Sequence, residues 1–252
     1  IVDIQQPMGG SITLTDTTFQ VLQSATSAVF FNTTSSQIQL NNTQMLSCIN
    51  GDSLIAAWMF NSTFNMTGGL CDHSTSSNGA SCVKITPNGS NITFVDSIFR
   101  NLEQNMGSPI VVEFLQSTNL VFESLQFTNS TSAMLQAAIR VMNGTLSNNV
   151  TISDVTVSGS TGLFGTVLVF TTEETNVVLQ DSTFIDNIMD DTNVQFISGS
   201  VICTNNSFRN NTGLHSNCGL GIRHFSGTAD VNGNYFGHNT ALTRGVFFYD
   251  TF

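Results

Sequence analysis

Short apolar segments with one repeating pattern follow each other along the whole chain. The segment NVVLQDSTF at 176–184 shows the pattern. A first apolar residue is followed two positions later by a second, a small polar residue or Gly stands at the fourth step, and a bulky apolar residue or Cys stands at the seventh. Nine copies begin at Ile12, Ile38, Phe64, Ile92, Leu120, Val150, Val177, Val201 and Ala229. Successive copies are 24 to 30 residues apart, which indicates a repeat architecture.

A second kind of apolar segment lies between successive copies. It is rich in β-branched and aromatic residues, as in SAVFF at 27–31, SLIAAWMF at 53–60 and PIVVEF at 109–114. Each period therefore predicts three short strands: the apolar pair, a strand that follows the bulky residue, and this second segment. Strands that recur in the same sense once per period predict a parallel β-solenoid. We expect an all-β fold with a single domain over residues 1–252.

Inward positions of a solenoid stack in columns, and the seventh step predicts a core column. It reads Phe19, Met45, Cys71, Phe99, Phe127, Val157, Phe184, Phe208 and Phe236. Offset stacking of neighbouring rings adds about 0.5–1.5 kcal/mol per pair beyond the burial of their area. The chain has twenty Phe against two Tyr and one Trp, which suits a dry interior with few hydrogen-bond partners.

The fourth step predicts a corner where the first strand turns into the second. Its column reads Asp16, Asn42, Gly68, Asp96, Ser124, Asp154, Asp181, Asn205 and Gly233. Asp, Asn and Gly tolerate the left-handed backbone of tight turns. A carboxylate that recurs at one geometric position is expected to belong to a structural ladder rather than to a catalytic site.

This pattern resembles the right-handed parallel β-helix family, the pectate-lyase-like superfamily, over essentially residues 1–252. The last third is also similar to the repeats of polymorphic outer-membrane proteins, which carry a Phe-x-x-Asn signature. The matching segments are FIDN at 184–187, FRNN at 208–211 and FGHNTA at 236–241. The resemblance implies a right-handed coil, here of about nine coils with three short strands each. It also implies that catalytic carboxylates and a Lys or Arg would lie on the outer face of one sheet, formed by the third strands.

The outward column of that sheet contains the candidate catalytic residues. We expect it to read Asp3, Phe30, Met59, Lys84, Glu113, Arg140, Val169, Gln195, Arg223 and Phe247. Lys84, Glu113 and Arg140 would then lie on adjacent coils, about 4.8 Å apart. Alternating charges stabilise neighbouring strands by a few tenths to about 1 kcal/mol per pair, and we favour this structural interpretation. A sugar-cleaving or sugar-binding role is the alternative.

Other candidate chemistry is sparse. The acidic pairs Glu173–Glu174 and Asp190–Asp191 fall in segments between strands, where solvated charge is the ordinary explanation. The four histidines show no metal-ligand spacing among themselves or with Cys: His73, His215, His224 and His238. No nucleophile elbow, phosphate-binding loop or dinucleotide fingerprint is present. We therefore expect no metal and no cofactor.

Charge and hydropathy exclude two classes of partner. Net charge is −11 with only six basic residues, so nucleic acid is not expected to bind. No apolar run approaches the roughly 20 residues of a membrane helix. The chain opens on Ile1 without a signal peptide, and we take it as a mature or trimmed chain.

Glycosylation sequons favour an extracellular protein with covalent N-glycans. Eleven Asn-x-Ser/Thr motifs occur, at Asn32, Asn41, Asn61, Asn65, Asn88, Asn91, Asn129, Asn143, Asn149, Asn205 and Asn210.

Five cysteines point to the same oxidising route. Cys71 and Cys82 bracket the polar stretch CDHSTSSNGASC and form the first candidate disulfide. Cys203 and Cys218 form the second candidate pair, although Cys203 falls at an inward position where a buried free thiol is equally expected. Cys48 is left over, either buried or bonded to another chain.

Both ends of the chain fit the third-strand pattern, with IVDI at 1–4 and GVFFYDTF at 245–252. We therefore expect a solenoid uncapped at both ends, as a slice of a longer solenoid or as a subunit that stacks end to end. The sequence predicts a glycosylated extracellular structural or adhesive protein, at the cell surface or secreted, whose partners are copies of itself and extracellular glycans or a cell surface. We expect it not to be an enzyme; the alternative is a β-helix that binds or cleaves polysaccharide.

Overall fold

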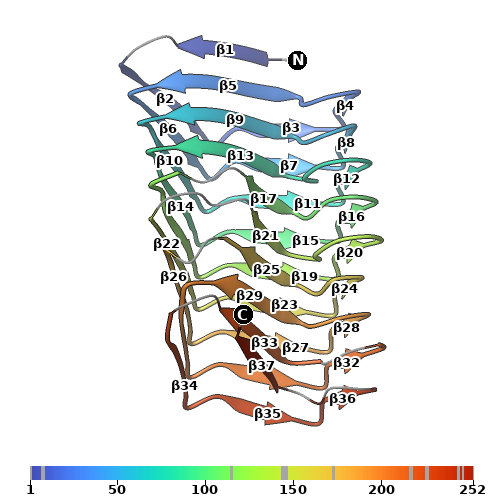
Figure 1. Cartoon of the computed structure of the whole chain (residues 1–252). Helices are drawn as coiled ribbons and strands as arrows, with labels where there is room; N and C mark the ends of the chain where they lie inside the picture. Colours follow the sequence, from blue (N-terminus) through green and yellow to red (C-terminus); the bar gives the residue numbers. More distant parts are fainter. Residues whose placement is uncertain are drawn as a thin grey trace.

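The structure of the protein is a computed structural model that describes residues 2–6, 9–113, 116–142, 147–171, 174–215, 218–224, 227–242, 245 and 247–251. All secondary structure of these residues is β, and the chain winds as a solenoid whose strands lie in stacked rows (Figure 1). Every strand is parallel to its neighbour one coil away. The predicted parallel β-solenoid is therefore confirmed.

Four sheets, A to D, follow the solenoid axis. Sheet A has ten strands: β1 (Val2–Gln6), β5 (Val29–Thr34), β9 (Ile55–Phe60), β13 (Val83–Asn88), β17 (Ile110–Glu113), β21 (Ile139–Met142), β25 (Val167–Phe170), β29 (Val194–Ser198), β33 (Leu220–His224) and β37 (Phe247–Thr251). Sheet B has nine: β2 (Gly10–Thr15), β6 (Ser36–Asn41), β10 (Thr63–Thr67), β14 (Asn91–Val95), β18 (Asn119–Glu123), β22 (Asn148–Ser153), β26 (Thr175–Gln180), β30 (Ser200–Thr204) and β34 (Ala229–Asn232).

Sheets C and D are built from shorter strands. Sheet C has nine: β3 (Thr18–Gln20), β7 (Gln44–Leu46), β11 (Leu70–Asp72), β15 (Ile98–Arg100), β19 (Gln126–Thr128), β23 (Thr156–Ser158), β27 (Thr183–Ile185), β31 (Ser207–Arg209) and β35 (Tyr235–Gly237). Sheet D has nine strands of two residues: β4 (Gln23–Ser24), β8 (Ile49–Asn50), β12 (Thr75–Ser76), β16 (Glu103–Gln104), β20 (Thr131–Ser132), β24 (Thr161–Gly162), β28 (Ile188–Met189), β32 (Thr212–Gly213) and β36 (Thr240–Ala241).

The nine strands of sheet B match the nine template copies, but each coil has four strands instead of three. The bulky seventh-step residue stands at the centre of a sheet C strand, as Phe184 does in β27. The additional strand belongs to sheet D. A strand of two residues has only one side chain that points inward. It therefore shows no alternation of apolar and polar residues that could reveal it in the sequence.

The core is a set of apolar columns. Phe99 and Phe127 stack with ring centroids 4.8 Å apart, and Phe184, Phe208 and Phe236 stack at 5.0 Å intervals. Sheet B adds a second aromatic row, in which the ring centroids of Phe94 and Phe122 are 5.4 Å apart. A parallel in-register ladder brings identical positions together at the strand spacing, which suits offset stacking.

Left-handed residues form the corners of the coil. All nine residues of the predicted fourth-step column lie between sheets B and C with φ between 50° and 66°. A second column of nine lies between sheets C and D with φ between 50° and 59°: Val21, Ser47, His73, Asn101, Asn129, Gly159, Asp186, Asn210 and His238. A third corner between sheets A and B includes Ser35, Asn61, Gly89 and Ser117. The sequence analysis predicted only the first corner.

Polar side chains directly after the corners point inward and bind backbone amides of the preceding coil. Ser97 Oγ accepts from Gly69 N at 3.0 Å, and Ser62 Oγ accepts from Ser36 N at 3.1 Å. Asn148 Oδ1 accepts from Thr118 N at 2.9 Å. A buried N–H without a partner is costly, so these side chains explain why Ser, Thr and Asn recur between the apolar pairs.

The Phe-x-x-Asn segments provide the longest of these inward ladders. Their asparagines are Asn187, Asn211 and Asn239, each directly after a left-handed residue. Asn211 Oδ1 accepts from Asn187 N and Nδ2, both at 3.1 Å, and its Nδ2 donates to Phe184 O at 2.9 Å and to Asn239 Oδ1 at 3.0 Å. The signature therefore combines a Phe ring that stacks in the core with an inward Asn amide whose polar atoms have hydrogen-bond partners.

Candidate functional site

The sheet A charge cluster lies on the outer face of sheet A and consists of Asp52, Lys84, Glu113 and Arg140. Lys84 is in β13, Glu113 ends β17, and Arg140 is in β21. Lys84 Nζ lies 3.4 Å from Asp52 Oδ1 and 3.6 Å from Glu113 Oε2. Burial lowers the pKa of the Arg140 guanidinium, and the Glu113 carboxylate opposes this shift. The structure thus brings the three predicted candidates together and adds Asp52.

The predicted single outward column is wrong in register. Lys84 pairs with Val111 and Val111 with Arg140, whereas Glu113 pairs with Met142 in the next outward column. Met59 and Val169 are buried and point inward. A slip of one residue moves a strand side chain to the opposite face of the sheet. The slip arises because the segments between sheets D and A differ in length, with four residues at 51–54 and six at 77–82.

The contacts of the charge cluster are those of a cross-strand ladder. Two carboxylates flank one ammonium, and the side chains of Lys84 and Glu113 are 27% and 21% exposed. Partly exposed pairs of this kind contribute at most about 1 kcal/mol each. Chemically, the cluster offers two cations, Lys84 and Arg140, two coils apart on the outer face, and the carboxylates of Asp52 and Glu113 balance their charge.

A second ionic cluster lies on sheet C and was missed by the sequence analysis. Asp72 is only 8% exposed and accepts from Arg100 Nε at 2.9 Å and Asn101 Nδ2 at 3.0 Å, while His73 Nδ1 lies 2.6 Å from its Oδ1. Burial raises the pKa of the Asp72 carboxyl. The hydrogen bonds from Arg100 and Asn101 and the nearby positive charges lower this pKa by a larger amount, so the net shift is downward. His73 is the chain neighbour of Asp72, whereas Arg100 and Asn101 reach it through the register between adjacent coils, which residue types alone do not show.

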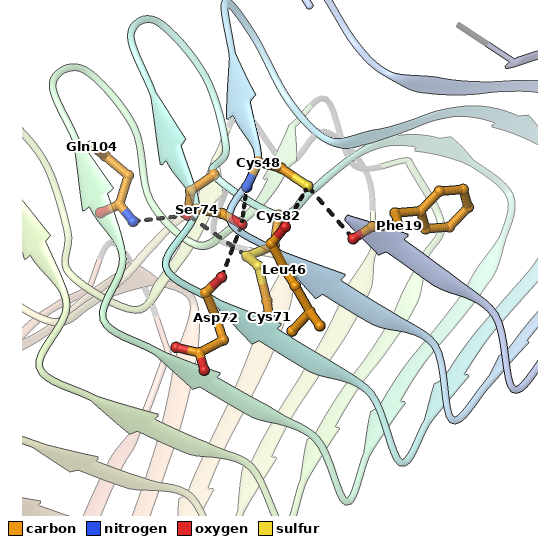
Figure 2. Close-up of a disulfide and its surroundings, with 9 residues drawn as sticks. Phe19, Leu46, Cys48, Cys71, Asp72, Ser74, Cys82 and Gln104 are labelled. Atoms are coloured by element: carbon orange, nitrogen blue, oxygen red, sulfur yellow. Dashed lines mark hydrogen bonds between the residues drawn. A yellow bond between two sulfur atoms is a disulfide. The ribbon is translucent and has the colours of Figure 1, made fainter. Parts of the chain in front are cut away.

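Cys71 and Cys82 form a disulfide with a Cα–Cα distance of 6.4 Å. Figure 2 shows the bridge among inward side chains, close to Ser74 and Cys48. Both half-cystines are fully buried, and Cys71 occupies the core column between Met45 and Phe99. The bridge therefore crosses the interior of one coil and closes the polar stretch that it brackets.

Cys203 and Cys218, the second candidate pair, are both free and buried. Cys203 lies in β30 of sheet B, whereas the position equivalent to Cys71 in its coil is held by Phe208 of sheet C. The predicted disulfide is therefore wrong, and the buried free thiol is the outcome. Burial raises the pKa of Cys203 to about 12 and also raises that of Cys218.

The leftover Cys48 is buried as well. Its thiol donates to Leu46 O at 3.3 Å, as Figure 2 shows. Of the two alternatives for this residue, the structure gives the buried thiol.

None of the ten described sequon asparagines is buried. Asn32 and Asn88 lie on sheet A, and four others lie on sheet B: Asn41, Asn65, Asn91 and Asn149. The remaining four stand at corners: Asn61, Asn129, Asn205 and Asn210. Asn143 lies outside the described residues, as do Glu173 of the acidic pairs and Arg244.

The predicted corner carboxylates make structural contacts. Ser124 Oγ donates to Asp154 Oδ2 at 2.9 Å, and Asn42 Nδ2 donates to Asp16 Oδ1 at 3.0 Å. Among the described residues, no three His, Cys, Asp or Glu side chains are close enough to hold a metal ion. In the same residues, no helix is long and apolar enough to cross a membrane.

No protein-family model matches the chain, and no curated protein gives a significant sequence match. The fold defines the class: the chain is a repetitive parallel β-solenoid protein, consistent with the β-helix superfamily that it resembles.

Proposed function

We propose that the chain is an extracellular, N-glycosylated β-solenoid with a structural or adhesive role. Further coils continue it end to end, either in a filament of copies of itself or within a longer surface solenoid. A cell surface or extracellular glycans are its other proposed partners, and no catalysis or cofactor is part of this role. The observation that carries the proposal is the exposure of the core at the terminal coils.

Apolar side chains that are sealed in the middle of the solenoid are open at its two ends. In β2, Ile12 and Leu14 are only partly buried, whereas their partners Ile38 and Leu40 in β6 are fully buried. At the other end, Val231 of β34 is 37% exposed, whereas its partner Cys203 is fully buried. Among the described residues, β2 and β34 each have one strand neighbour within their sheet. A further coil would cover the apolar groups and pair the free backbone edge.

Two observations support an extracellular setting. None of the ten described sequon asparagines is buried, as glycan attachment requires. The Cys71–Cys82 disulfide is typical of an oxidising compartment. Glycans on sheets A and B would cover the sides of the solenoid and leave its ends for stacking.

Electron microscopy and sedimentation of the secreted glycoprotein test the proposal. We expect filaments one solenoid wide, with the coils of one copy continuing those of the next. Leu14→Asp places a charge at the open end of the core and should abolish the filaments. Thr13→Asp, on the outward side of the same strand, is the matched control and should keep them. Monodisperse particles one solenoid long from the native source, with no longer chain, would contradict the proposal.

Binding of acidic polysaccharide by the sheet A charge cluster is the second candidate. Lys84 and Arg140 are two of only six basic residues and lie two coils apart in one outward column. The double variant Lys84→Gln/Arg140→Gln should lose at least about tenfold in affinity for an anionic glycan if this role is real. Glu113→Gln should abolish any turnover. If binding and turnover are unchanged in these variants, the cluster serves only as a structural charge ladder between strands.

A further inference from the structure

Three aromatic side chains form an exposed patch on the outer face of sheet A. This aromatic patch consists of Phe30, Trp58 and Phe60; Trp58 is 57% exposed and Phe60 48% exposed. Phe30 meets Trp58 edge to face, with ring centroids 5.4 Å apart. Trp58 is the only tryptophan of the chain, and it is exposed although the interior holds many stacked rings.

Sequons surround the aromatic patch. Asn32 is the register partner of Trp58, and Asn88 is the register partner of Phe60. Asn61 directly follows Phe60 and is exposed. Partners on adjacent strands lie about 4.8 Å apart, so the amide nitrogens that would carry sugars start within reach of both rings.

The Asn32 sequon lies on the same face as the patch. Alternation along β5 places Phe30, Asn32 and Thr34 on the outer side, since Phe31 and Thr33 between them are buried. A glycan on Asn32 therefore leaves the sheet between Phe30 and the neighbouring Trp58. The face of a pyranose ring that carries only C–H groups is apolar, and covering an aromatic ring with it removes apolar surface from water.

We infer that the aromatic patch is a docking surface for the chain's own N-glycans, with the first sugars on Asn32 packed against Trp58 and those on Asn61 and Asn88 against Phe60. The inference rests on the proposed glycosylated state and assigns these sugars a place on the protein. A sugar tethered one strand spacing away has a high effective concentration, which favours it over free carbohydrate at the same rings. Asn149 of sheet B, by contrast, has Asn119 and Asn176 as its register partners and no aromatic residue there.

The single tryptophan makes the test specific. Glycopeptide mass spectrometry first establishes occupancy of Asn32. Trp58 emission and its quenching by acrylamide are then measured in the secreted glycoprotein and in Thr34→Ala and Thr34→Ser. Thr34→Ala destroys the sequon and keeps Asn32, whereas Thr34→Ser keeps the sequon. We expect Thr34→Ala to shift the emission to the red and to raise the quenching constant about twofold, and Thr34→Ser to match the wild type.

Two further samples guard against indirect effects. Asn210→Gln removes a sequon on a distant coil and should leave Trp58 unchanged. Enzymatic removal of glycans from the folded wild type should reproduce Thr34→Ala, even if that variant folds poorly. A glycan on Asn32 with no change in quenching on its removal would overturn the inference. An unoccupied Asn32 beside occupied sequons elsewhere would overturn it too, whereas no occupancy at any sequon would contradict the proposed glycoprotein itself.

Discussion

The residues at the corners of the coil determine how much backbone strain each turn carries. Each corner position needs positive φ, which Gly, Asn and Asp adopt with little strain and β-branched residues do not. The fourth-step column is filled almost entirely by Asp, Asn and Gly, so the sequence predicts that corner. The column between sheets C and D is more mixed, with Val21 and two histidines, and sequence reasoning did not find it.

Val21→Asn should stabilise the protein. Val21 has φ of 50° and is 73% exposed, so its side chain brings strain without a compensating core contact. Relief of that strain should raise the free energy of unfolding by about 1 kcal/mol. Urea unfolding followed by circular dichroism measures it. Val121→Asn, on an outward strand position, is the control and should be neutral or destabilising; equal effects would contradict the strain argument.

Asn211→Ala should be among the most destabilising single substitutions of a polar residue. It removes the acceptor of Asn187 N and the donor to Phe184 O, and both partners are buried. Leaving such groups unpaired should cost about 3 kcal/mol. Chemical denaturation should show the loss, while Asn176→Ala, in the exposed ladder, should change stability by less than about 0.5 kcal/mol. A loss below about 1 kcal/mol for Asn211→Ala would refute the buried-ladder role.

Asp72→Asn should flatten the acid dependence of stability. Because the pKa of folded Asp72 lies below the ordinary 3.8, the unfolded chain takes up the proton first. The Arg100 and Asn101 contacts therefore stabilise fully above that value and are lost as the pH falls through the lower folded pKa. Thermal unfolding of wild type and variant between about pH 6 and 2 measures this. Parallel curves over that range would show that Asp72 does not contribute in this way.

Whole strands were predictable where several alternating residues share one face. The apolar pairs of sheet B and the segments of sheet A repeat with a recognisable pattern, so the parallel solenoid follows from them. The register of sheet A could not be predicted in this way, because segments of variable length precede its strands. As a result, Glu113 lies in the outward column next to that of Lys84. The two candidate disulfides differ for another reason: Cys71, which bonds Cys82, lies in sheet C, whereas Cys203 lies in sheet B.

Loss of the Cys71–Cys82 bridge should loosen one coil without removing the fold. Closing a loop with a sequence separation of 11 should contribute about 3 kcal/mol. Cys71→Ala/Cys82→Ala should therefore unfold at a lower temperature than the wild type, and reductant should lower the wild-type midpoint while leaving the variant unchanged. Cys203→Ala lacks a core thiol but keeps the bridge, so it should stay sensitive to reductant. A wild type that is indifferent to reductant would contradict the contribution.

At the scale of the molecule, a solenoid has contacts only between neighbouring coils, so its length is set by what covers the end coils. In the proposed glycoprotein, the open cores at β2 and β34 would leave the ends of the solenoid available for association, and glycans on its sides would prevent contact between the flanks. This division favours linear over lateral assembly. An end-to-end contact between unlike surfaces propagates unless its rotation closes a ring.

Assembly should strengthen with ionic strength. Each chain carries a net charge of −11, so stacked copies repel one another over a distance set by screening. Raising NaCl from about 10 mM to about 150 mM shortens that distance from about 30 Å to about 8 Å and should lengthen the filaments. Light scattering and electron microscopy across the series measure the effect, with Leu14→Asp as the non-assembling control. Filaments that shorten with salt would mean that ion pairs, not apolar coil-on-coil contact, hold the ends together. A particle mass that stays at that of one glycosylated chain throughout would contradict self-stacking and leave continuation within a longer chain.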